Sequence, residues 1–300
     1  MEYVTENHSF VKKSVLPSFI AVVVATVAAC AVRVYQLLNI TEQRSGFYTD
    51  ASNWSVKTLY GILAAVGVLC FVLFVLNAVK EKKSAPTPSC QTQRSGRDIF
   101  MGLLVLVMCA AFFVDFVSQA ASIVELYSSY NHLIPLFQYV YSSGIVPMAF
   151  QGLLALCTCF YFTIYAAGCF GASVRPASFR VLSLAPSLWL MCRMIVHFMT
   201  PIRYLNVSQR LFEMFAIILG MVFFFNFAKS CSEMKNKFSV SKITASALAF
   251  GCMALVSCVP RLIVMMIGKG SLLPESSATV VTDVMAGIFA LSCVLNFYKR

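Results

Sequence analysis

Charged residues are scarce in this chain, and their scarcity decides its class. Asp, Glu, Lys and Arg make up 12% of the 300 residues, whereas a soluble domain of this size carries roughly 25%. Hydrophobic residues make up 59%, and the mean hydropathy is +0.80. This composition excludes a soluble domain and predicts an integral membrane protein.

Histidine and catalytic motifs are equally scarce. The three histidines are His8 in the N-terminal segment, His132 in a loop and His197 in an apolar run, so no predicted helix carries the paired histidines of a haem site. The sequence has no H-E-x-x-H, no G-x-S-x-G, no Walker loop and no glycine-rich dinucleotide turn. We therefore predict no catalytic residue, no metal site and no cofactor. An acid pair of Glu213 and Asp283 is the one enzymatic alternative.

What the sequence does contain is eight apolar runs, each long enough to cross a hydrocarbon core of ~30 Å at ~1.5 Å per residue. They lie at 16–38, 56–79, 99–124, 145–170, 179–199, 208–228, 243–266 and 279–298. The first run is longer than the apolar core of a typical cleaved signal peptide, so we interpret it as a span, with cleavage as the alternative. The predicted fold is an all-α polytopic bundle of eight transmembrane helices in one membrane domain, 1–300.

Eight spans also divide into two halves of four, 1–172 and 173–300, with the same orientation. Residues 38–44 after the first span read LNITEQR, and residues 205–210 after the fifth read LNVSQR. Many transporters are built from such repeats. A likeness of one short polar turn does not establish duplication, which stays an open alternative.

Lys and Arg are divided unequally between the two sides of the predicted bundle. With a cytoplasmic N-terminus, fifteen lie on the inner side, five on the outer side and three within spans. Cytoplasmic loops carry such an excess, so the sequence predicts N-in and C-in. The net charge of +11 is then explained by contact with the anionic headgroups of the lipid bilayer, and no nucleic-acid partner is expected. We expect the plasma (cytoplasmic) membrane as the location.

None of the twelve cysteines lies in a predicted outer loop, which does not favour a disulfide framework. The outer loop at 125–144 is rich in aromatic residues, as is typical of the headgroup level. We predict a short interfacial helix there, broken at Pro135. A lid over an outward-facing cavity is the alternative. The aromatic residues of this loop are Tyr127, Tyr130, Phe137, Tyr139 and Tyr141.

Six charged residues lie within the predicted spans beyond the first three positions, and the rise of ~1.5 Å per residue places all of them in the outer third of the bilayer. Four polar residues share that depth, Gln36, Gln119, Gln151 and His197, and the last three are grouped with the six charges. Together these nine form the candidate polar site. They are Arg33, Asp115, Gln119, Gln151, Arg193, His197, Glu213, Arg261 and Asp283.

The six charges divide into two groups by their position in the spans. For Arg33 and Arg261 we expect side chains that snorkel outward, and for Glu213 and Asp283 positions in first turns, where an acid complements the helix dipole. Asp115 and Arg193 lie deeper, where an uncompensated charge costs ~2.5–3.5 kcal/mol. We therefore expect these two to share an interior polar site, either as a pair or as part of a solute site.

Two functions follow, and the sequence does not choose a substrate for either. The first is transport or translocation of a small solute or lipid through an outward-facing polar cavity. The second is a membrane-embedded sensory or assembly subunit with no chemistry of its own, which requires a partner membrane protein. The first predicts that Asp115 and Arg193 contact a ligand, and the second predicts a fixed ion pair.

Overall fold

A computed structural model describes the chain at residues 2–41, 48–49, 52–81, 96–130, 135–171, 178–199, 207–232, 239–268 and 277–299. Eight helices in these ranges are long and apolar enough to cross a membrane. The all-α fold and the eight predicted spans are confirmed, with boundaries that differ by a few residues. The chain is a multi-pass membrane protein.

The helices follow the apolar runs because a backbone in hydrocarbon must satisfy its hydrogen bonds internally. Within the described ranges, the short helix α4 precedes α5, and a 3₁₀ turn, η2, directly precedes α6. The elements are α1 (Glu2–Asn39), α2 (Trp54–Glu81), α3 (Gly96–Ser128), α4 (Leu136–Ser142), α5 (Ile145–Cys169), η2 (Leu182–Leu184), α6 (Ala185–Met199), α7 (Val207–Cys231), α8 (Ser239–Met266) and α9 (Ser277–Lys299).

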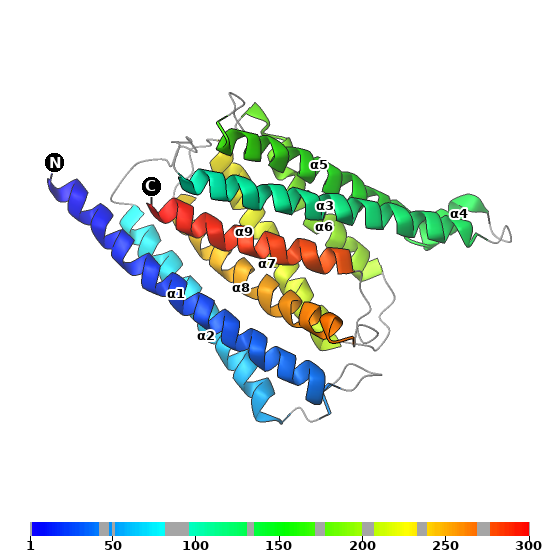
Figure 1. Ribbon diagram of the computed structural model, residues 1–300, viewed down its shortest axis with the longest axis horizontal. Helices are drawn as coiled ribbons and strands as arrows, with labels where there is room; N and C mark the ends of the chain where they lie inside the picture. Colours follow the sequence, from blue (N-terminus) through cyan, green and yellow to red (C-terminus); the bar gives the residue numbers. More distant parts are fainter. Residues whose placement is uncertain are drawn as a thin grey trace.

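The bundle is layered, with α8 and α9 between two outer pairs. Figure 1 shows α1 and α2 along one edge and α3 and α5 along the opposite edge. Helix α8 packs against α1, α2, α7 and α9, and α9 also packs against α3. The chain begins and ends at the same end of the bundle (Figure 1), as an even number of spans requires. The N-in orientation itself stays a prediction, and the boundary between the two possible halves, at 172 and 173, lies outside the described residues.

Helices α8 and α9 approach one another closely because glycines face each other at their contact. A Cβ added to Gly251 would lie 2.6 Å from Leu291 Cγ, and one added to Gly287 would lie 3.1 Å from Ala254 Cβ. Small residues allow this approach in membrane bundles. By contrast, a Cβ at Gly61 or Gly67 on α2 would meet nothing within 4 Å. Helices α8 and α9 therefore form a tight central unit, and α2 lies at the periphery.

An aromatic cluster fills the middle of the bundle between α5, α7 and α9. The rings of Phe162, Phe227 and Phe289 are at most 1% exposed, and the centroid of Phe289 lies 5.4 Å from those of the other two. Phe112 joins this cluster to Trp189, with ring centroids 4.9 Å apart in an edge-on contact. Aromatic rings in such contacts contribute packing energy beyond their buried area. The cluster closes the interior on one side of Trp189.

The predicted interfacial helix is α4, which begins directly after Pro135. Pro135 therefore starts the helix rather than breaking it, as expected for a residue that cannot donate a backbone hydrogen bond. Tyr139 donates to the carbonyl oxygen of Leu126 at 2.7 Å and ties α4 to the end of α3. Phe137 and Tyr141 are 85% and 69% exposed. These exposed rings are suited to the headgroup region.

Candidate functional site

The six intramembrane charges lie inside the bundle, and each comes from a different helix. All are buried at one level, near the end where α1, α6 and α8 finish and where α7 and α9 begin, whereas α3 continues past Asp115 to Ser128. We call this set of side chains the charged layer. Its exposed fractions are 1% for Arg33, 0% for Asp115, 4% for Arg193, 3% for Glu213, 1% for Arg261 and 8% for Asp283.

The expected snorkelling of Arg33 and Arg261 is therefore wrong, and so are the expected first-turn positions of Glu213 and Asp283. Arg33 and Arg261 do not snorkel, and Glu213 and Asp283 are buried although each lies close to the start of its helix. The physical reason is the neighbouring helices. Each group finds polar partners across the bundle, so it does not need to reach the headgroups to be solvated.

At one end of the layer, two guanidinium groups share a single carboxylate. We call this the guanidinium-rich end; it consists of Arg33, Gln209, Glu213, Arg261 and His197. Arg261 forms a buried ion pair with Glu213. The other oxygen of Glu213, Oε2, lies 3.2 Å from Nε2 of His197. Gln209 Nε2 also donates to Glu213 Oε1 at 3.2 Å and to Ser257 Oγ at 3.2 Å. The carboxylate of Glu213 is thus fully engaged.

Arg33 is held by neutral oxygens instead of a carboxylate. Its guanidinium donates to Tyr48 Oη at 2.6 Å, to Gln209 Oε1 at 2.9 Å and to Gln36 Oε1 at 3.1 Å. The guanidinium carbon also lies 4.9 Å from the centroid of the Phe212 ring, a favourable cation–π distance. The buried Nε of Arg33 has no hydrogen-bond partner. Among the described residues, no carboxylate pairs with Arg33.

At the other end, two carboxylates share one guanidinium. We call this the carboxylate-rich end; it consists of Asp115, Trp189, Arg193 and Asp283. Arg193 on α6 pairs with Asp283 on α9 at 2.5 Å. Asp115 accepts a hydrogen bond from Trp189 Nε1 at 3.2 Å, and its other oxygen, Oδ1, is buried without a hydrogen-bond partner. Arg193 and Asp115 thus lie in one interior polar region, but the carboxylate that pairs with Arg193 is Asp283.

A cysteine connects the two ends. The thiol of Cys258 on α8 lies 3.7 Å from Asp283 Oδ2, and Arg261, Glu213 and Arg193 are also close enough to act on it electrostatically. Cys258 is 1% exposed. The charged layer is therefore continuous across the bundle, with Cys258 at its centre.

The remaining predicted site residues lie beside this network rather than within it. Gln119 is half-buried on α3, one turn beyond Asp115, and its side-chain amide lies within reach of the Asp115 carboxyl. Gln151 is 2% exposed on α5, next to Gly152, which packs against Gln119 and Phe116. The hydrogen bonds of the charged layer described above do not involve Gln151. Both glutamines lie at the contact between α3 and α5.

Six residues that join the six charges in this network were not among the nine predicted, and one of them, Gln36, follows Arg33 by three positions on the same helix. Three of them precede a charged residue by four positions and therefore share its helix face: Trp189 before Arg193, Gln209 before Glu213, and Ser257 before Arg261. The i, i+4 spacing could have identified these three. The other two, Tyr48 and Cys258, have no such signal, since Tyr48 comes from a loop and Cys258 is one of many cysteines in spans.

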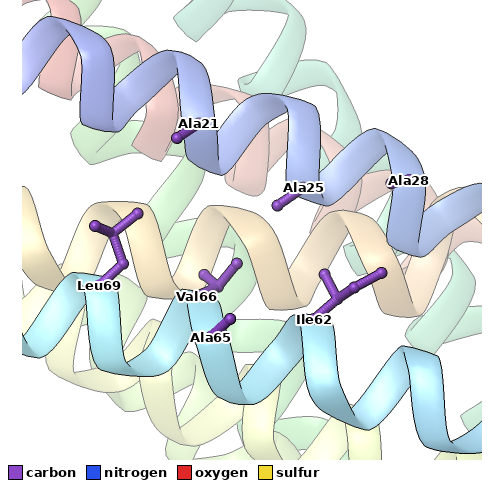
Figure 2. Close-up of a pocket in the computed structure, with 7 residues that line it drawn as sticks. All are labelled: Ala21, Ala25, Ala28, Ile62, Ala65, Val66 and Leu69. Atoms are coloured by element: carbon purple, nitrogen blue, oxygen red, sulfur yellow. The ribbon is translucent and has the colours of Figure 1, made fainter.

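A separate hollow lies between α1 and α2, within the apolar part of both helices (Figure 2). Its volume is about 260 Å³. The lining is entirely apolar: Ala21, Ala25, Ala28, Ile62, Ala65, Val66 and Leu69. This hollow differs in chemistry from the charged layer and offers no hydrogen bond from a side chain.

In the part of the chain that the structure describes, His, Cys, Asp and Glu form no group of three suited to a metal ion. The chain matches no protein-family model, no curated protein and no solved structure. The fold and the charged layer therefore define the class: a multi-pass membrane protein with a buried, hydrogen-bonded ionic layer.

Proposed function

We propose that this protein moves a small solute or lipid across the membrane and that the charged layer is the region where the cargo binds. The observation that carries this proposal is the origin of the six charges, each from a different helix and all directed inward. Ionisable residues inside a membrane bundle are costly and most often mark a pathway for ions or solutes. A bundle needing only packing energy would place apolar residues at these positions.

The charge count of the layer also supports binding. Three guanidinium groups face three carboxyl groups, and among the described residues the ion pairs Arg193–Asp283 and Arg261–Glu213 join four of these six. Arg33 and Asp115 are left at opposite ends without a charged partner in contact. Below the layer, Trp189 and the aromatic cluster close the interior. We interpret this arrangement as a binding region closed on the side of the aromatic cluster.

The native thiol of Cys258 provides a direct test of opening. A variant is made that keeps Cys258 and replaces the other eleven cysteines. If the layer opens during transport, Cys258 reacts with a membrane-impermeant methanethiosulfonate reagent added to one side of proteoliposomes. The matched control keeps only Cys252, which is equally buried at 1% exposure on the same helix. We expect labelling of Cys258 at least about tenfold faster than that of Cys252, because only the layer becomes wetted.

A variant with a single thiol at the exposed loop position, Ser129→Cys, reports that the reagent reaches the protein. If Ser129→Cys labels readily while Cys258 stays unlabelled from both sides, the layer does not open. Transport would then be wrong, and a subunit role would replace it.

The subunit role is the second candidate, and the position of α1 and α2 favours it. Only 22% of the most apolar window in each of these spans is buried inside the protein, compared with 67% in α9. A photo-crosslinking residue at Val68 on α2, 64% exposed, tests for a partner helix in native membranes. Val114 on α3, 54% exposed, is the control. A discrete crosslinked product at Val68 alone supports a partner, and no product at either position contradicts one.

A further inference from the structure

We infer that the guanidinium-rich end is a binding site for a small oxyanion, a phosphate or carboxylate group, with Arg33 as the residue that anchors it. This inference rests on the proposed function and names the chemistry of the cargo. The site lies at the end of α1, where Arg33, Gln36 and Gln209 meet beneath Tyr48.

The first argument is electrostatic. Arg33 is 1% exposed and has only neutral oxygens as hydrogen-bond partners. Glu213, the carboxylate of this end, is already paired with Arg261. Arg261 is also close enough to Arg33 for the two cations to repel one another. A buried cation that has no counter-ion is expensive, and an anion bound at Arg33 removes that cost.

The second argument is the unused donor. The Nε–H of Arg33 is buried and has no hydrogen-bond partner, and a buried donor without an acceptor costs free energy. A guanidinium presents its donors as a planar fork that matches the two oxygens of a carboxylate or phosphate. An oxyanion is therefore the ligand class that satisfies both the charge and the geometry of Arg33.

The third argument concerns the group that covers Arg33. Tyr48 is half-buried, and its hydroxyl oxygen accepts from Arg33 at 2.6 Å. It comes from the connection between α1 and α2, where Thr41 and Tyr48 form an isolated bridge. A phenol oxygen at this distance occupies the position that a ligand oxygen would take. Tyr48 therefore competes with the anion for Arg33.

The test measures the unfolding midpoint of the purified full-length protein in detergent while inorganic phosphate, or separately acetate, is added at constant pH and ionic strength. Chloride is the reference anion. We expect a saturable rise in the midpoint with at least one oxyanion, because a ligand that binds only the folded state stabilises it. No rise with either oxyanion, beyond that seen with chloride, overturns the inference.

Three variants assign the effect to Arg33. Arg33→Gln keeps a hydrogen-bonding side chain but loses the charge, and its apparent affinity for the anion should fall by about tenfold or more. Arg180→Gln is the matched control, since Arg180 is an exposed arginine outside the charged layer, and it should keep the response. An equal response in Arg33→Gln and the unmodified protein overturns the inference. Should Arg33→Gln fail to fold, Tyr48→Phe decides, because loss of the competing hydroxyl should tighten binding and unchanged or weaker binding contradicts this model of the site.

A lipid arm distinguishes the two sources of an oxyanion. Phosphatidylglycerol in mixed micelles presents a phosphate on a lipid, and zwitterionic phosphatidylcholine is its control. Stabilisation by free phosphate or acetate indicates a soluble cargo, and stabilisation by phosphatidylglycerol alone, lost in Arg33→Gln, indicates a lipid headgroup. The Cys258 experiment separates this inference from transport. If the anion binds and Cys258 stays unreactive, the oxyanion site is supported and transport is refuted. If Cys258 reacts and no anion binds, transport is supported and the oxyanion site is refuted.

Discussion

The two ends of the charged layer have opposite compositions built on the same plan. Each end holds one ion pair and one further charge that has only neutral partners in contact. At the guanidinium-rich end the pair is Arg261–Glu213 and the further charge is Arg33. At the carboxylate-rich end the pair is Arg193–Asp283 and the further charge is Asp115. The comparison shows that the formal charges of the six residues cancel, with the excess positive charge at α1 and the excess negative charge at α3.

The largest expected effect is an unequal response of the two ends to loss of a carboxylate. Glu213→Gln leaves two buried guanidinium groups with no carboxylate at their end, and we expect a loss of about 3–5 kcal/mol in the free energy of unfolding. Asp283→Asn leaves Arg193 close to Asp115, which can replace the lost partner, so we expect about 1–3 kcal/mol. Chemical unfolding of the purified variants in detergent measures both. Equal losses of unfolding free energy would contradict the idea that the different compositions of the two ends decide the cost of removing a carboxylate.

The second prediction concerns which carboxylate pairs with Arg193. In a double-mutant cycle, Arg193→Met and Asp283→Asn should couple by about 1–3 kcal/mol, because their side chains are in direct contact. Arg193→Met and Asp115→Asn should be additive to within about 0.5 kcal/mol while Asp283 is present. Unfolding free energies of the single and double variants give both couplings. Stronger coupling to Asp115 would assign the pair to α3 instead of α9.

The smallest effects should come from a neutral partner, Gln209, and from Asp115, the carboxylate without a cation in contact among the described residues. Gln209→Leu removes an amide that bonds to Arg33, Glu213 and Ser257, and we expect a loss of about 1–3 kcal/mol from the donors and acceptors left unsatisfied. Asp115→Asn keeps an oxygen that accepts from Trp189 and removes a buried charge, so its effect should stay within about 0.6 kcal/mol, the mean for a hydrogen bond in a membrane bundle. Thermal unfolding midpoints provide the ranking. A larger loss in Asp115→Asn would show that its charge is needed for stability.

The helices could be predicted from the sequence because hydrocarbon demands long apolar runs and a fixed rise per residue. The same rise placed the six charges at one depth, and the structure brings them to one level. The partners could not be predicted. Whether Arg193 contacts Asp283 or Asp115 depends on how α6 is rotated relative to α3 and α9, and a single sequence does not specify that rotation.

Burial of Arg33 and Arg261 was missed for a related reason. The snorkelling expectation treats each helix as if it stood alone in lipid, where a long side chain near the helix end reaches the headgroups. In the bundle, Gln209 and Glu213 on α7 bring acceptors to these guanidinium groups. The i, i+4 spacing of Gln209 and Glu213 was visible in the sequence. The sequence did not show which helix their shared face would contact.

The glycine contact between α8 and α9 has a consequence for how the layer responds to voltage. Because Gly251 and Gly287 leave no space between these helices, α8 and α9 must move as one body. Both ion pairs run from this body to α6 and α7: Arg261 to Glu213 and Asp283 to Arg193. Separating α6 and α7 from it leaves one cation and one anion on each side. No net charge moves through the transmembrane field, so the membrane potential neither drives nor opposes that step.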